Sequence, residues 1–269
     1  MSQAESDRRK GKLTCVSTGM LLGAHLTPAS RSAIVNADIV YSAAASAISE
    51  QWLQTLNPNF HSLQPHYAEG TDRRISYRAM VDTMLSSVRS GLSVCAAFYG
   101  HAGVFAWAGH AAVRQARSEG FSAYMEPGVS AADCLFADLG FDPGAVGCQH
   151  YECTQFMFNQ RLIDPSAYLV LWQVSIAGDR SGGRFHTPSD YRALLIRRLA
   201  EDYPLDHGVT LYQAAALATE TPRIENIPLS KLAEAETHPT TTLIIPPAKK
   251  MTRNSDMLDA AAELESAAI

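Results

Sequence analysis

The sequence has no excess of basic residues: 22 lysines and arginines face 27 aspartates and glutamates, and the formal net charge is −5. Proteins that follow nucleic-acid phosphates usually carry a basic patch, so this balance argues against a nucleic-acid partner. No apolar run approaches the roughly 20 residues of a membrane-spanning helix. The polar start, MSQAESDRRKGK, lacks the apolar stretch of a signal peptide. We therefore expect a soluble, cytoplasmic protein without a membrane partner.

Cysteines are few and poorly spaced for metal binding. The five cysteines form an odd set without a CxxC pair, which is typical of free thiols in a reducing compartment. His101 has no cysteine or histidine at ligand spacing. We therefore expect no metal site and no disulfide framework.

Strands and helices are expected to alternate in the first half of the chain, which indicates a parallel α/β lobe. The pattern breaks at Glu126–Ser130, where we place the boundary between two lobes covering residues 12–127 and 128–250. The expected strands are 13–16, 39–41, a weak one near 62–63, 94–99 and 121–125. One expected helix begins at Pro28, and the others cover 46–56, about 72–90 and 104–119.

The second lobe has fewer helices and more widely separated strands, which predicts a mixed sheet. Ser130 is a plausible N-cap for a helix that runs to Leu139. The acidic, alanine-rich tail 251–269 fits either a terminal helix or a disordered segment. The further expected strands are 168–174, 209–212, 223–227 and 241–245, with a helix over 189–203 and a short one from Ser230.

The stretch 94–105, VCAAFYGHAGVF, reads as a buried strand followed by a glycine-containing loop. In open parallel sheets, ligands bind where strands end and helices begin. Glycines at 100 and 103 allow the backbone to approach a ligand closely. Tyr99 would stand at the mouth of such a site.

The helix expected over 72–90 has a periodic apolar face that includes Tyr77. Arg73, four residues earlier, projects from the same face and must find a partner or a cavity. Its neighbour Arg74 points elsewhere and is expected to be a solvated surface charge.

Five motifs lie between residues 12 and 250: 98–105 (FYGHAGVF), 73–77 (RRISY) preceded by Tyr67, 116–121 (ARSEGF) with 125–139 (MEPGVSAADCLFADL), 171–174 (LWQV) and 241–250 (TTLIIPPAKK). Together they resemble, in the family's order along the chain, the borosin peptide-backbone α-N-methyltransferases, whose Tyr-Gly-His-Pro-Gly-Val-Phe loop is similar to 98–105. These enzymes have the tetrapyrrole-methylase (class III) fold and use S-adenosylmethionine. The closest resemblance is to the bacterial split type, in which enzyme and peptide are separate chains.

Three positions depart from the family pattern. Ser17-Thr18-Gly19 stands where Gly-x-Gly is usual, so the backbone could approach a ligand less tightly there. Ala102 replaces the usual proline and leaves the loop less restricted in φ. Ala132 stands where an acidic residue is frequent.

The resemblance implies a two-lobed α/β fold with S-adenosylmethionine in the cleft between a parallel N-terminal lobe and a mixed-sheet C-terminal lobe. It implies a reactive cluster of Tyr67, Arg73, Tyr77 and Tyr99. We interpret Tyr77 as a base or proton relay assisted by Arg73, with Tyr67 and Tyr99 donating toward the amide oxygen. The expected cofactor residues are Gly100, His101, Gly103, Val104, Phe105, Ser130, Ala131, Gln173, Tyr212, Thr241 and Thr242.

The resemblance also implies a partner and an assembly. The partner would be a separate ribosomal precursor peptide, methylated iteratively, because the tail after Lys250 offers no apolar core segment as a substrate. A homodimer is expected, and with two peptides it could form a heterotetramer. The alternatives are another class III enzyme, such as a precorrin-type C-methyltransferase or a methylase of RNA or of a modified histidine, and a non-catalytic module that grips a peptide.

Overall fold

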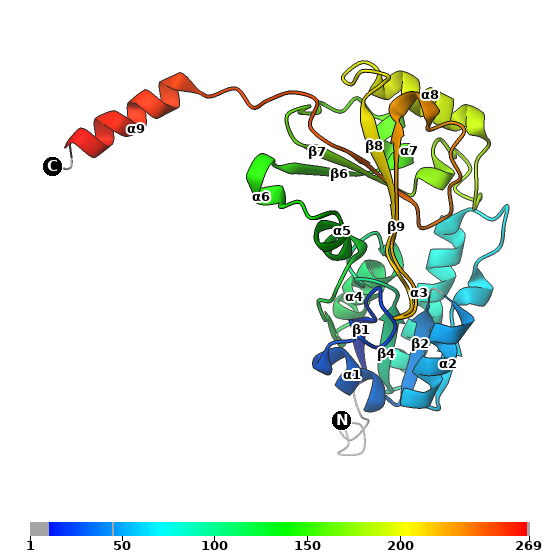
Figure 1. The fold of residues 1–269 in the computed structure, drawn as a ribbon. Helices are drawn as coiled ribbons and strands as arrows, with labels where there is room; N and C mark the ends of the chain where they lie inside the picture. The colour runs from blue at the N-terminus through cyan, green and yellow to red at the C-terminus, as the bar shows by residue number, and fades with distance from the viewer. Residues whose placement is uncertain (1–10, 45, 268–269) are drawn as a thin grey trace.

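The computed structural model describes residues 11–44 and 46–267, and it contains two sheets in two lobes joined by one linker (Figure 1). Every strand and helix of the first lobe precedes the linker at residues 126–130, and every strand of the second lobe follows it. Within the described ranges, no helix is both long and apolar enough to cross a membrane.

The first sheet has five strands in the order β3-β2-β4-β1-β5, and all neighbouring pairs are parallel. The carboxyl ends of these strands therefore lie at one edge of the sheet. In chain order the strands are β1 (Lys12–Ser17), β2 (Ile39–Ala43), β3 (Phe60–Ser62), β4 (Ser93–Phe98) and β5 (Ser122–Met125).

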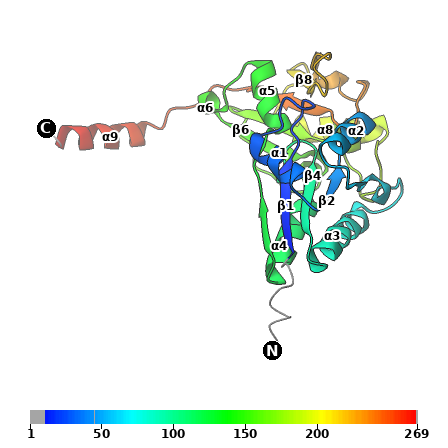
Figure 2. The same cartoon turned by 90° about the horizontal axis from the view of Figure 1, so that it is seen from below.

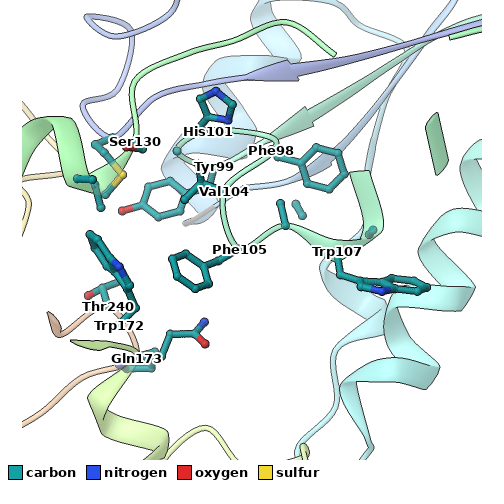
Figure 3. A pocket seen from close by; sticks show the side chains of 18 of the residues that line it. Phe98, Tyr99, His101, Val104, Phe105, Trp107, Ser130, Trp172, Gln173 and Thr240 are labelled. Carbon is teal, nitrogen blue, oxygen red and sulfur yellow. The ribbon is translucent and has the colours of Figure 1, made fainter. Parts of the chain in front are cut away.

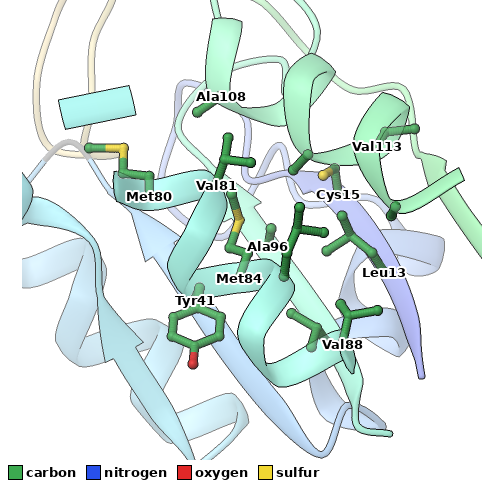
Figure 4. Close-up of a cluster of buried hydrophobic side chains, with 14 of the residues drawn as sticks. Leu13, Cys15, Tyr41, Met80, Val81, Met84, Val88, Ala96, Ala108 and Val113 are labelled. Atoms are coloured by element: carbon green, nitrogen blue, oxygen red, sulfur yellow. The ribbon is translucent and has the colours of Figure 1, made fainter. Parts of the chain in front are cut away.

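Helices cover both faces of this sheet (Figure 2). Successive strand side chains point to opposite faces, so Cys15 joins the core under one helix pair while Val16 joins the core under the other. In Figure 4, Val81, Met84 and Val88 of α3 pack toward Leu13 and Ala96 of the sheet. The first pair is α3 (Arg73–Arg89) with α4 (Trp107–Ser118), and the second is α1 (Pro28–Val35) with α2 (Ala47–Leu56).

The second sheet is mixed, in the order β6-β7-β10-β8-β9. Only the β6–β7 pair is parallel. Its strands are β6 (Cys148–Glu152), β7 (Tyr168–Trp172), β8 (Gly208–Gln213), β9 (Arg223–Pro228) and β10 (Thr242–Ile245).

Both faces of the second sheet are also covered. Leu135 of α5 (Ala131–Leu139) packs on one face, and Leu195 and Leu199 of α8 (Ser189–Leu199) pack on the other. The remaining helices are α6 (Pro143–Val146), α7 (Cys153–Phe158), α9 (Ser255–Ala267) and the 3-10 turns η2 (Gln64–His66), η3 (Val174–Ile176) and η4 (Leu229–Lys231).

The expected α/β class, with a parallel first sheet and a mixed second sheet, is confirmed. Ser130 caps α5 as predicted, and Asp133 accepts from the backbone N–H of Ser130 in return, which completes a capping box. The five cysteines are free, and Cys15, Cys95 and Cys153 are buried.

Several element boundaries were predicted wrongly. The helix expected from residue 104 begins at Trp107, the strand expected to reach 174 ends at Trp172, and the helix expected to reach 203 ends at Leu199. The edge strand β6 and the short helices α6 and α7 were not predicted. The tail forms α9, which is exposed along its whole length and points away from both lobes (Figure 1).

Two neighbouring leucines on α8 test the packing of the second lobe. Leu195 is fully buried, whereas Leu194 is 45% exposed. Leu195→Ala should lower the free energy of unfolding by about 2–5 kcal/mol because it leaves a cavity, and Leu194→Ala by less than about 1 kcal/mol. Chemical denaturation followed by circular dichroism measures both values. Equal losses in the two variants would contradict this packing.

Candidate active site

A cavity of about 270 Å³ lies between the two sheets, and both lobes contribute to its lining (Figure 3). The first lobe supplies the loop after β4 together with the aromatic rings of Tyr67 and Tyr77. The full lining is Met20, Ala43, Tyr67, Tyr77, Phe98, Tyr99, Gly100, His101, Val104, Phe105, Ala106, Trp107, Ala108, Ser130, Ala131, Ala132, Trp172, Gln173, Pro239, Thr240 and Thr242.

The loop after β4 is held at its first turn by a backbone bridge. Gly19 and Gly100 exchange two N–H···O bonds of 3.1 Å. Gly100 has φ +65°, in the left-handed region that glycine enters without a steric penalty. This bridge directs the chain from the end of β4 into the cavity.

The next contact of this loop involves two of the positions that depart from the family pattern. The backbone N–H of Ala102 donates to Oγ of Ser17 at 2.9 Å, and both residues are fully buried. A proline at 102 would have no N–H, and a glycine at 17 would have no hydroxyl. The two departures are therefore complementary: the serine satisfies the donor that the alanine introduces.

Gly103 supports the loop from behind and does not line the cavity. A Cβ there would meet Sδ of Met125 at 2.9 Å. Its N–H donates to Nδ1 of His101 at 2.9 Å, and its carbonyl oxygen lies 2.9 Å from Nε2 of His110. The imidazole of His110 therefore ties the loop to α4.

Two residues that line the cavity, one from each lobe, have a positive φ. Phe105 has φ 51° and Gln173 has φ 60°, and among the described residues they are the only non-glycine residues with positive φ. Such conformations cost about 1–3 kcal/mol each and concentrate at functional sites. Both residues were predicted to bind cofactor, although nothing in the local sequence indicated their backbone strain.

Several aromatic rings line the cavity and contact one another. The ring of Phe105 lies 5.8 Å from that of Trp172, which joins the first lobe to the second (Figure 3). Tyr77 stacks on Trp107 at 6.1 Å, and Tyr67 meets Tyr77 edge-on at 6.1 Å.

The phenols of Tyr67 and Tyr99 are hard to ionise. Burial, followed by the charge of an ionised Tyr77, raises the pKa of Tyr67, while the positive charge of Arg73 opposes the rise. Burial, followed by the charges of Cys134 and Glu220, raises the pKa of Tyr99 to about 12. Both groups therefore stay protonated at neutral pH and can donate hydrogen bonds into the cavity.

Arg73 does not line the cavity. Its Nη2 donates to the carbonyl oxygen of Arg184 at 2.5 Å, and its guanidinium lies 6.0 Å from the ring centre of Phe185. Arg73 and Tyr77 lie one turn apart on α3, as predicted. The guanidinium of Arg73, however, contacts a loop of the second lobe instead of entering the cavity. Arg74 is a surface charge as predicted, paired with Asp72 at 2.6 Å and 81% exposed.

Two further predicted residues lie behind the wall. The hydroxyl of Tyr212 donates to Oδ2 of Asp138 at 2.6 Å, and its side chain is 1% exposed. Thr241 is fully buried, where its Oγ1 accepts from the N–H of His238 at 2.8 Å. Both residues support the strands that carry Trp172 and Thr242.

Eleven of the predicted site residues line the cavity, but other lining residues were not predicted. Trp107 was not predicted because the helix that it begins was expected to start at residue 104. Met20 and Thr240 lie in loops whose only signal was their position near predicted strand ends. The predicted residues on the wall are Tyr67, Tyr77, Tyr99, Gly100, His101, Val104, Phe105, Ser130, Ala131, Gln173 and Thr242.

Residues 12–228 match the tetrapyrrole (corrin/porphyrin) methylases. The chain belongs to this family. Solved structures agree at the level of the fold. A uroporphyrin-III-C-methyltransferase from Thermus thermophilus superposes with a TM-score of 0.61 at 19% identity, covering 88% of this chain and 93% of that one. A diphthine synthase gives 0.61 at 16% identity, covering 89% and 91%.

Curated relatives in this family are more similar in sequence. A methyltransferase/type I borosin cyclic peptide precursor of Coprinopsis marcescibilis is 38% identical over 85% of this chain and 59% of its own length. The methyltransferase/omphalotin A precursor of Omphalotus olearius is 34% identical over 95% of this chain and 62% of its own length. The chain thus spans about 60% of these relatives. Both are fungal, so the expected bacterial split type stays a prediction.

The contact between Ser17 and Ala102 can be tested with a double-mutant cycle. Ser17→Ala alone should cost about 1–3 kcal/mol in the free energy of unfolding, because it leaves the buried N–H of Ala102 without an acceptor. In an Ala102→Pro background, which has no N–H at that position, the same change should cost about 1 kcal/mol less. Denaturation of the four proteins gives the coupling energy. If the two substitutions changed the free energy of unfolding additively, a direct hydrogen bond between Ser17 and Ala102 would be contradicted.

Proposed function

We propose that this chain is an S-adenosylmethionine-dependent methyltransferase that N-methylates backbone amides of a ribosomally made precursor peptide. The observation that carries the proposal is one cavity in which three phenols, those of Tyr67, Tyr77 and Tyr99, meet a glycine-containing loop of a methylase fold. Relatives named as borosin methyltransferase/precursor proteins, at 34–38% identity, support the choice of substrate.

The lining suits the cofactor by its chemistry. Phe105, Trp172 and Met20 offer apolar surfaces, and Ser130, Thr240 and Thr242 offer hydroxyls from two separate segments. Gly100 brings backbone close to the cavity without a side chain in the way. Bound there, S-adenosylmethionine would supply an electrophilic methyl group.

A backbone amide resists methylation because its nitrogen lone pair is delocalised into the carbonyl group. Protonated phenols directed at the amide oxygen stabilise the negative charge that develops there when the N–H proton leaves. Tyr67 and Tyr99 suit this role because their raised pKa values keep them protonated.

Tyr77 is then the candidate for the group that accepts the amide proton. The charge of an ionised Tyr77 is one cause of the raised pKa of Tyr67, so Tyr67 remains a donor beside an anionic Tyr77. Arg73 assists from outside the cavity: its positive charge partly offsets the rise in the pKa of Tyr67, and its hydrogen bond to the carbonyl of Arg184 holds the start of α3.

The proposal includes a separate peptide and a dimer. The described tail does not suit the substrate role, because α9 is acidic, exposed and directed away from the cavity (Figure 1). We propose, independently of where the sequence ends, that the peptide is presented by another chain and is methylated repeatedly. The proposed enzyme is a homodimer, which with two peptides forms a heterotetramer.

The role of Tyr77 is tested by Tyr77→Phe. This variant keeps the ring that stacks on Trp107 and removes only the hydroxyl. Methyl transfer should fall by about 10²–10⁴-fold, since general base catalysis contributes roughly that factor. Binding of S-adenosylhomocysteine, measured by calorimetry, should stay within about twofold of the parent value.

Tyr124→Phe is the matched control, because this tyrosine is 44% exposed on β5 and does not line the cavity. It should leave both rates and binding unchanged. Wild-type turnover in a folded Tyr77→Phe protein would remove this hydroxyl from the mechanism.

The separate-substrate proposal is tested with residues 1–250 and the full chain, each incubated with cofactor and a peptide. The probes are a peptide encoded beside the gene and the segment of the Omphalotus olearius relative that this chain does not match. Mass spectrometry should find +14 Da increments on the peptide with both proteins, because each added methyl replaces a hydrogen. Loss of methylation with residues 1–250, or methyl groups within 251–269 of the enzyme, would contradict the proposal.

A further inference from the structure

Trp172 forms the second-lobe wall of the cavity, and its ring is held from behind by a histidine. Its indole Nε1 lies 3.2 Å from Nδ1 of His150 on the neighbouring strand β6, and the two rings are stacked at 5.7 Å. Trp172 is 6% exposed, and its ring also contacts that of Phe105 across the cavity. The hydrogen bond to His150 and this ring contact together connect the edge strand β6 to the loop after β4.

The donor and acceptor in this contact follow from the chemistry of the two rings. An indole N–H can only donate, so Nδ1 of His150 accepts. A neutral imidazole then carries its proton on Nε2, which faces Sγ of Cys148 at 3.1 Å. Partial burial lowers the pKa of His150, which favours this neutral form.

This assignment excludes a Cys148–His150 catalytic pair. With Nδ1 engaged by Trp172 and Nε2 carrying the proton, the imidazole has no lone pair free to take a proton from the thiol. Burial also raises the pKa of Cys148 to about 11, so the thiol is neutral at physiological pH. The pair is better explained as a support for Trp172.

A support is needed because a buried indole can adopt two ring orientations that differ by a half-turn. Only one of them places the N–H on an acceptor, and the other leaves a buried donor unsatisfied, which costs about 1–3 kcal/mol. The ring of Phe136, on α5, meets the ring of His150 edge-on at 6.0 Å. Because α5 also carries Ala131 and Ala132 of the cavity lining, the histidine links two parts of the wall.

We propose that His150 is a positioning residue: by accepting the indole N–H of Trp172, it fixes the orientation of the ring that forms the cofactor side of the cavity. The cofactor side is assigned because Trp172 opposes Phe105 and adjoins Gln173. The inference rests on the proposed function only where cofactor affinity is the readout. The orientation of the indole itself does not depend on that function.

Two substitutions separate the acceptor from the bulk of the side chain. His150→Asn places an amide oxygen near the position of Nδ1 and keeps an acceptor, whereas His150→Leu keeps volume and removes it. The indole N–H signals of the three tryptophans are followed by ¹H–¹⁵N NMR, with Trp172→Phe assigning the relevant one. His150→Leu should shift the Trp172 signal and speed its exchange with solvent, and His150→Asn should retain slow exchange.

Affinity for S-adenosylhomocysteine supplies the second readout. His150→Leu should weaken binding about tenfold, equivalent to about 1.4 kcal/mol, and His150→Asn by less than about threefold. In a Trp172→Phe background, which lacks the N–H, His150→Leu should have no further effect.

An unchanged Trp172 indole signal in His150→Leu would overturn the proposal, as would an equal loss of affinity in the Trp172→Phe background. His150→Leu could change the Trp172 indole signal while the wild-type protein binds no S-adenosylhomocysteine. In that outcome, the proposed function and the cofactor side of the inference both fail. In that case, the bond between His150 and Trp172 stands as a structural contact.

Discussion

The constraint on which the rest of the structure depends is the crowding at the end of β1, where the linker between the lobes crosses the first sheet. A Cβ on Gly128 would lie 2.2 Å from Cβ of Ser17, so only a glycine allows the linker to pass this closely. Oγ of Ser17 donates to the carbonyl oxygen of Glu126 at 3.3 Å and accepts the N–H of Ala102. One buried hydroxyl therefore fixes both the linker and the loop after β4.

The shape of the cavity follows from this crossing. Because the linker is held against β1, α5 begins just after its N-cap Ser130, beside the loop after β4, and both contribute to the lining of the cavity. The strained residues Phe105 and Gln173 then come from different lobes. Such conformations persist only where the surrounding structure holds them, and the Phe105 ring is held by its contact with Trp172 of the other lobe.

The fold could be predicted where one physical signal dominates. β4 (SVCAAF) is buried on both faces and reads as a strand from its apolar run alone, whereas β6 (CQHYE) is a half-exposed edge strand whose polar residues conceal it. Tyr77 was correctly placed by helical periodicity. The guanidinium of Arg73 was not, because its partner Arg184 is 111 residues away and periodicity carries no information about such contacts.

The same burial that makes the cavity suitable for its proposed chemistry also limits that chemistry. Removing phenols from water favours their neutral form, which strengthens Tyr67 and Tyr99 as donors but disfavours any tyrosine as a base. A cavity of this kind therefore needs a nearby positive charge that does not occupy substrate space. In the proposed mechanism, Arg73 supplies this charge from outside the cavity, where its guanidinium is held by a loop of the second lobe. The contact between the two lobes and the pKa of Tyr67 are consequently coupled through one arginine.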